Sequence, residues 1–188
     1  SMQNLKMSLG KNINAHVVGN TVLDNLSRYP SLAEDFVLVT MHRRENHENI
    51  KEWFTAINNI AKNSDLDFIL PLHPNPNVVK FSHILTDVEV VSPLPYDTCI
   101  DMVSRCKFLI TDSGGLQEES SFFGKRCIVC RKVSERTEGI GDFAFMCPEP
   151  KDLESIYDCV SNARPTLVPL DCPYGDGNSA EKIAEILR

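Results

Sequence analysis

The chain has 188 residues, of which 42% are hydrophobic and 24% charged, a composition typical of a globular protein with one sizeable α/β domain. Its net charge of -7 and pI near 5.2 argue against nucleic acid or an anionic membrane as the main partner, because both require a basic surface. The sequence has no run of about 18 apolar residues and no charged-then-apolar leader. We therefore expect neither a membrane span nor a signal peptide, and a cytoplasmic location.

The first ten residues suggest that this chain is part of a longer protein. Ser1 and Met2 resemble a cloning remnant. The stretch from Gln3 to Gly10 resembles the end of a helix that is closed by glycine, with its beginning missing.

Short apolar runs alternate along the chain with amphipathic segments. Phe36–Thr40 is continuous and β-branched, as is typical of a buried parallel strand, and the apolar residues between 48 and 62 recur at helical steps of three and four. Further strands are expected at 15–20, 67–72, 88–91, 107–111, 126–130 and 143–146, and further helices from 21, near 78, over 96–106, from 114, over 152–162 and over 179–188. This alternation predicts an α/β fold: a single doubly wound, Rossmann-like parallel sheet with helices on both faces.

Unusual polar residues follow the predicted strands, and ligands of such sheets bind outside the carboxyl ends of the strands. Arg43 and Arg44 have an alternative role as surface partners of neighbouring glutamates. His42 comes directly after a buried strand, which favours a role in a site. For His73, which lies in a proline-rich loop, a role in a site and no such role are about equally favoured. The residues at this edge are Thr40, His42, Arg43, Arg44, Glu45, His73, Asn75, Asn77, Asp112, Ser113, Gly114, Gly115, Arg131, Glu135, Arg136 and Glu138.

The strand ending at Thr111 breaks at Ser113-Gly114-Gly115 and restarts as a helix. A helix start offers unpaired N–H groups and a partial positive charge, and glycine lets a ligand oxygen approach the backbone. A carboxylate of Glu118 or Glu119 in the first turn is placed to face ligand hydroxyls. Ser-Gly-Gly alone is also compatible with a mere tight turn, but together with edge loops rich in Arg, His and Gly it predicts a nucleotide diphosphate site. The fingerprints of dinucleotide binders and P-loops are absent from the sequence.

Seven cysteines are scattered through apolar segments, which favours free thiols over a disulfide framework. Cys127 and Cys130 have CxxC spacing, but in a strand their side chains point to opposite faces, so buried thiols are favoured over a redox or metal role. We expect no metal site and no cofactor.

Six motifs, in order along nearly the whole chain, resemble those of the non-hydrolysing UDP-N-acetylglucosamine 2-epimerases, enzymes with a two-domain glycosyltransferase-B fold. The motifs with most weight are Asp112-Ser-Gly-Gly-Leu-Gln-Glu-Glu119 and Thr40-Met-His-Arg-Arg-Glu-Asn46. The others are Gly19-Asn-Thr-Val22, His73-Pro-Asn-Pro76, Ser134-Glu-Arg-Thr-Glu138 and Pro173-Tyr-Gly-Asp-Gly177. The resemblance implies that residues 1–188 are the C-terminal, UDP-binding domain, with the N-terminal domain absent from this chain.

The resemblance also implies a reaction and roles for residues. UDP is eliminated anti from the sugar to give a 2-acetamidoglucal and is then re-added, while carboxylates of the missing domain carry the proton at C2. By resemblance, the phosphates are bound by Ser113, Gly114 and Gly115, the ribose by Glu119, and UDP also by the loop of Arg136; His42 is required for activity, and Arg43 and His73 lie near the inter-domain cleft, where a second, activating UDP-GlcNAc can bind.

The sequence is therefore expected to form the UDP-binding half of an enzyme that makes UDP-ManNAc for surface polysaccharides, by resemblance as a homodimer. Two alternatives remain open. One is a related 2-epimerase that acts on a modified UDP-HexNAc, or a hydrolysing member that releases free ManNAc. The other is a non-catalytic module that binds UDP-sugars.

Overall fold

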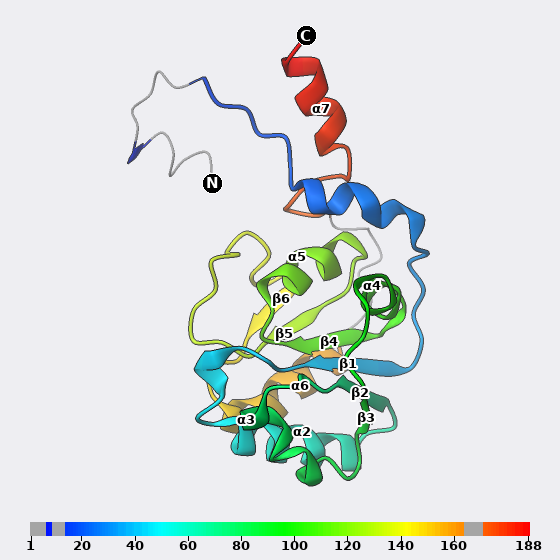
Figure 1. The fold of residues 1–188 in the computed structure, drawn as a ribbon, viewed down its shortest axis with the longest axis vertical. Coiled ribbons are helices and arrows are strands. Elements are labelled where there is room, and N and C mark those ends of the chain that lie inside the picture. The colour runs from blue at the N-terminus through cyan, green and yellow to red at the C-terminus, as the bar shows by residue number, and fades with distance from the viewer. Residues whose placement is uncertain (1–6, 9–13, 164–170) are drawn as a thin grey trace.

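The computed structural model describes residues 7–8, 14–163 and 171–188 and shows a six-stranded parallel sheet between two layers of helices (Figure 1). The strand order is β3-β2-β1-β4-β5-β6, so the chain moves outward from β1 and then restarts beside it at β4. The predicted doubly wound fold is confirmed. The elements are η1 Thr21–Arg28, β1 Phe36–Thr40, η2 Arg44–Asn46, α2 Ile50–Lys62, β2 Asp67–Pro71, α3 Pro76–Val79, η3 Ser82–Ile84, β3 Glu89–Val91, α4 Tyr96–Arg105, β4 Phe108–Thr111, α5 Gly114–Phe122, β5 Cys127–Val129, β6 Ala144–Met146, η4 Pro150–Asp152, α6 Leu153–Ser161 and α7 Ser179–Ile186, where η denotes a 3₁₀-helix.

A hydrophobic cluster lies on each face of the sheet, because alternate residues of β1 point in opposite directions. Val37 and Val39 enter the cluster formed with α2, α3 and α6. Phe36 and Leu38 enter the cluster formed with η1, α4 and α5. All five residues of β1 are buried, as expected for a central parallel strand.

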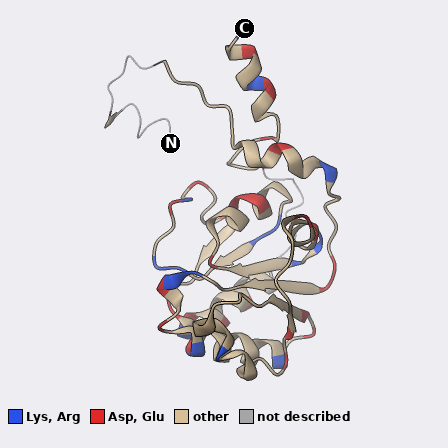
Figure 2. Ribbon diagram, viewed as in Figure 1, with Lys and Arg blue, Asp and Glu red and all other residues tan. Residues whose placement is uncertain are grey.

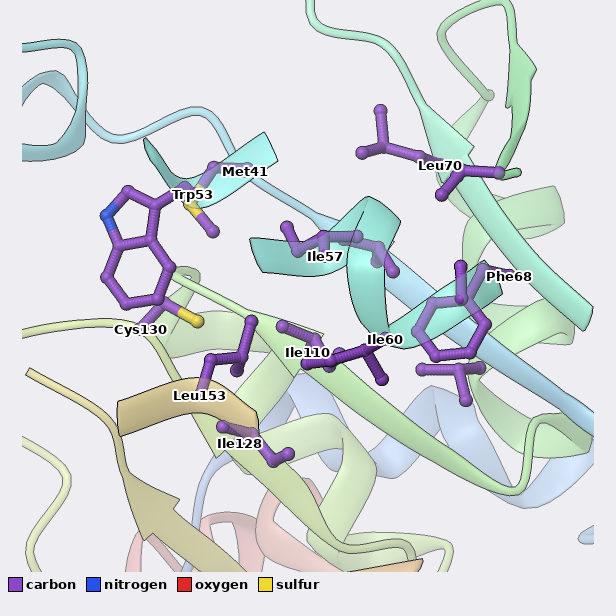
Figure 3. Packing of buried hydrophobic residues seen from close by; sticks show 14 of the residues in the cluster. Met41, Trp53, Ile57, Ile60, Phe68, Leu70, Ile110, Ile128, Cys130 and Leu153 are labelled. Atoms are coloured by element: carbon purple, nitrogen blue, oxygen red, sulfur yellow. The ribbon is translucent and has the colours of Figure 1, made fainter. Parts of the chain in front are cut away.

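The two cysteines of the CxxC spacing confirm the predicted separation. Cys127 belongs to the cluster under α4 and α5, and Cys130 to the cluster under α2, where it lies with Trp53 and Met41 at one end of the cluster (Figure 3). Burial raises the pKa of the Cys127 thiol to about 12 and also raises that of Cys130. In the described part of the chain, no group of three or more His, Cys, Asp and Glu is arranged to hold a metal ion.

The strand predicted at 15–20 is wrong. Val17 is 77% exposed, Gly19 has a φ of +92° that favours glycine, and the N–H of Asn20 donates to the carbonyl of Tyr174 at 2.8 Å instead of joining a sheet. The helical turn predicted from Thr21 is confirmed as η1, which Asn20 caps through a bond from the N–H of Val22.

Other predicted boundaries shift by one or two residues, as at β5 and β6, which have three residues each. The helix end predicted over residues 3–10 lies outside the described residues except for positions 7 and 8. No helix among the described residues is long and apolar enough to cross a membrane.

Candidate functional site

A cavity of about 380 Å³ opens at the carboxyl edge of the sheet, where β1 and β4 lie side by side and their following loops diverge. Such a point, where the order of strands reverses, is where ligands bind in doubly wound sheets. The volume is in the usual range for small-molecule sites. The cavity is lined by residues that follow β1, β2, β3 and β4, including His42, His73, Tyr96, Ser113 and Glu119.

Two histidines from neighbouring loops share one wall of the cavity. His42 follows β1 and His73 follows β2, and their rings stack with centroids 5.8 Å apart and planes inclined by 21°. Nδ1 of His73 accepts the N–H of Asn75 at 3.2 Å, which fixes the orientation of the exposed His73 ring. The structure therefore brings together the two histidines that the sequence placed at this edge.

The start of α5 supplies further polar groups to the lining of the cavity. Ser113 is the N-cap, and its hydroxyl accepts the N–H of Leu116 at 3.4 Å. Gly114 and Gly115 are the first helical residues, so no helical carbonyl precedes their N–H groups. A Cβ on exposed Gly115 would meet only the Ser113 hydroxyl, 3.9 Å away, which leaves its backbone open to a ligand that enters the cavity.

Gly114 has a different neighbour. A Cβ at this position would lie 3.1 Å from Cζ of Arg136, so the small residue makes room for the guanidinium. Arg136 donates to Glu118 at 2.7 Å and also pairs with Glu135. Acidic positions on α5 and basic positions in the loop after β5 are visible in Figure 2. A cation is thus held beside the positive end of α5, where an anion would be attracted by both.

Hydrogen bonds between uncharged groups also hold the loop that carries Arg136 against α5. The side chain of Gln117 donates to the carbonyl of Arg136 at 2.7 Å and accepts from the hydroxyl of Ser134 at 2.8 Å. The hydroxyl of Tyr174, in the last of the six motifs, donates to the same carbonyl at 3.3 Å.

Glu119 lies deeper in the cavity wall and is only 5% exposed. The phenol of Tyr96 donates to its Oε1 at 2.7 Å, which leaves Oε2 for another donor. Burial raises the pKa of Glu119, while the bond from Tyr96 acts in the opposite direction. Burial raises the pKa of Tyr96 as well, so it remains a donor at neutral pH.

The sequence predicts only that Asp112 lies at this edge of the sheet, and the structure gives its carboxylate several hydrogen-bond partners there. Asp112 is fully buried, and its oxygens accept the N–H groups of His42 and Arg43 and the side-chain amide of Asn46 at 2.8–3.1 Å. Nδ1 of His42 lies 3.4 Å from the same carboxylate. No sequence spacing signals this arrangement, because Asp112 is 66–70 residues away from its partners.

The predicted site residues therefore fall into two groups. His42, His73, Ser113, Gly115 and Glu119 line one cavity. The lining does not include Gly114, Arg136 or Arg43: the first two lie together beside the start of α5, and Arg43 meets Asp112 through its backbone.

A second hollow, of about 520 Å³, lies between α2 and η4. Its lining includes Lys51, Glu52, Glu149 and Lys151 and none of the predicted site residues.

Comparison with known proteins identifies similar chains. The family model described as UDP-N-acetylglucosamine 2-epimerase matches residues 2–188. A UDP-N-acetylglucosamine 2-epimerase of Campylobacter jejuni is 36% identical over 164 residues, which cover 81% of this chain and 43% of the relative. The chain thus spans about half the length of such relatives.

Solved structures show the same partial coverage. The structure described as an S. aureus MnaA-UDP co-structure superposes with a TM-score of 0.86 at 25% identity and covers 98% of this chain and 57% of its own. The structure of UDP-GlcNAc 2-epimerase from Neisseria meningitidis bound to UDP-GlcNAc gives a TM-score of 0.76 at 29% identity, with 90% and 54% covered.

Proposed function

Because the chain belongs to the UDP-N-acetylglucosamine 2-epimerase family, we propose that it is the UDP-binding half of a two-domain enzyme that interconverts UDP-GlcNAc and UDP-ManNAc. The observation that carries this proposal is the meeting of the α5 N-terminus, Glu119 and His42 in one cavity. The relatives add support, since one is a co-structure with UDP and another is bound to UDP-GlcNAc.

The site is suited to holding UDP as a leaving group. In this proposal the N–H groups of Gly114 and Gly115 bind the diphosphate and stabilise the negative charge that it gains as the bond to the sugar breaks. Arg136, which is paired with Glu118 and Glu135, lies beside them. Glu119 has one oxygen fixed by Tyr96 and one available to accept hydrogen bonds from the ribose hydroxyls. His42 lines the same cavity and is the catalytic residue of this half of the site. The missing domain supplies the carboxylates that transfer the proton at C2.

Isothermal titration calorimetry with UDP tests the binding half of the proposal. The chain is expected to bind UDP, and Glu119→Ala is expected to weaken binding at least about tenfold, because it removes a charged acceptor of hydrogen bonds. Glu149→Ala, which changes a carboxylate at the other hollow, serves as a control and should bind UDP like the original chain. Equal affinities for the Glu119→Ala variant and the original chain would refute the ribose assignment.

Product analysis tests the reaction. The 188-residue chain alone is expected to show no turnover of UDP-GlcNAc, whereas the two-domain enzyme should yield UDP-linked ManNAc by NMR. Free ManNAc would indicate a hydrolysing enzyme instead, and UDP binding without turnover by the two-domain protein would favour a non-catalytic module. Turnover by the pure isolated chain would contradict the assignment of proton transfer to a second domain.

We also propose a cytoplasmic homodimer that acts in the synthesis of surface polysaccharides. Arg43 and His73 are proposed to face a second UDP-GlcNAc in the inter-domain cleft. Support comes from the position of His73, which is exposed at the rim of the cavity, beside His42.

A further inference from the structure

The buried carboxylate of Asp112 is held by a single loop. Its oxygens accept the N–H of His42 at 3.0 and 3.1 Å, the N–H of Arg43 at 2.8 Å and the amide of Asn46 at 3.0 Å. Among the described residues, Asp112 forms no ion pair with a lysine or an arginine. A buried carboxylate is costly unless its lone pairs are satisfied, so this loop is bound firmly to the end of β4.

Asn46 extends the same unit to β5. Its side chain is buried and donates both to Asp112 and to the carbonyl of Cys130, each at 3.0 Å. Asp112 therefore lies where the ends of β1, β4 and β5 are locked together, beneath the wall of the cavity.

The imidazole of His42 lies against this group of bonded residues. Nδ1 lies 3.4 Å from Oδ1 of Asp112, and the ring lines the cavity, where it stacks on His73. The carbonyl of His42 is held too, by Nε2 of His47 at 3.2 Å. A proton on Nδ1 lies close to this carboxylate and leaves Nε2 as the nitrogen available to a ligand.

We propose that Asp112 is a positioning residue for His42: it fixes the main chain of the loop and holds the imidazole as the Nδ1–H tautomer, with Nε2 directed to the cavity. The part of this proposal that concerns turnover rests on the function proposed above. The part that concerns the tautomer depends only on the geometry of Asp112 and His42.

Another carboxylate of the chain also accepts hydrogen bonds from backbone N–H groups, but it is not paired with a histidine among the described residues. Asp24 accepts the N–H groups of Ser179 and Ala180 at 2.9 and 2.7 Å and lies outside the cavity. Asp24→Asn is therefore the matched control for Asp112→Asn. Both changes disturb bonds from backbone N–H groups, but only Asp112→Asn changes the partner of an imidazole.

The first test is the NMR spectrum of the imidazole nitrogens in the unmodified chain, with the His42 signals assigned by their loss in His42→Gln. The expected result is the Nδ1–H tautomer of neutral His42. The opposite tautomer would overturn the proposal, and this measurement requires no variant of Asp112 to fold. UDP titration of the same sample reports on the proposed function separately, because it measures the affinity for UDP and not which ring nitrogen of His42 carries the proton.

The second test compares variants. Asp112→Asn is expected to lose the Nδ1–H preference and, in the two-domain enzyme, to lower kcat between about 10² and 10⁴-fold with KM within about threefold. Asn46→Ala keeps the carboxylate and should keep the tautomer, and Asp24→Asn should lower Tm with kcat unchanged. If Asp112→Asn retains the tautomer and kcat, or if its kcat falls no more than in Asp24→Asn, Asp112 has only a structural role.

Discussion

At the scale of single residues, Glu119 combines deep burial with a position in the wall of a cavity proposed to bind UDP. Burial raises its pKa above the usual 4.5, so the folded state holds the proton more tightly than the unfolded state. The associated stability is present below about pH 4.5 and is lost as the pH rises through the raised pKa. The role proposed for Glu119 in binding UDP therefore comes at some cost to stability.

Glu119→Gln tests this relation. The amide oxygen can still accept from Tyr96, while the cost of burying a charge disappears. The variant should therefore have a higher Tm than the original chain at pH 7, and the difference should vanish below about pH 4, where the acid is neutral in both states. Thermal unfolding at the two pH values measures it; an equal or lower Tm at pH 7 would show that ionised Glu119 is not penalised.

Gly115 and Gly124 allow a binding effect to be separated from a backbone effect. Gly115 faces the cavity without a positive φ, so Gly115→Ala should leave Tm nearly unchanged but weaken UDP binding, because the methyl group enters the approach to the α5 N–H groups. Gly124 has a φ of +69° and open space around it, so Gly124→Ala should cost about 1 kcal/mol and leave UDP binding intact. Calorimetry and urea unfolding of both variants check the pair, and the reverse pattern would contradict it.

The meeting of several residues in one cavity was predictable from the sequence because parallel strands end at the same edge. His42, His73, Ser113 and Glu119 each follow a strand or begin the next helix, and the edge rule alone predicts that they meet. Asp112 was not assigned a role because its partners are mainly main-chain N–H groups of a distant loop. The bond from Tyr96 to Glu119 was also missed, since no pattern links residues 23 positions apart on two different helices.

At the scale of elements, helix α5 depends on its cap. Ser113→Ala removes the hydroxyl that accepts the N–H of Leu116 and is expected to lower the free energy of unfolding by about 1 kcal/mol. Ser113→Thr keeps an acceptor and should lose less. Urea unfolding distinguishes them, and an Ala variant as stable as the original chain would show that the 3.4 Å contact contributes nothing.

The elements predicted most accurately were those in which the pattern of apolar residues along the sequence agrees with the pattern of buried residues in the structure. Buried β1 and amphipathic α2 were expected with their observed boundaries or within two residues. The segment 15–20 has a local strand pattern, yet Gly19 turns the chain and Asn20 bonds to Tyr174, more than 150 residues later. Local propensity was overridden there by a tertiary contact, which no short window of sequence contains.

At the scale of the whole molecule, two hydrophobic clusters share one sheet, so they should unfold together. Leu109→Ala, in the cluster under α4 and α5, is expected to lower the free energy of unfolding by about 2–5 kcal/mol. Trp53 is the chain's single tryptophan and lies in the other cluster.

The change at Leu109 should therefore shift the Trp53 fluorescence transition and the far-UV circular dichroism transition by the same amount in urea. A fluorescence midpoint that stays in place while the dichroism midpoint moves would show two independent units instead of one.

The pairing of Thr40 with Thr111 has a consequence for how chains of this kind vary in length. The two residues are in register at the ends of β1 and β4, and their hydroxyls lie 2.7 Å apart in a buried position. His42 and Ser113 each follow two residues later, so a single insertion or deletion in either strand would turn one wall of the cavity away from the other. Insertions and deletions should therefore be excluded from 36–42 and 108–115 but accepted in the exposed connection at residues 30–35.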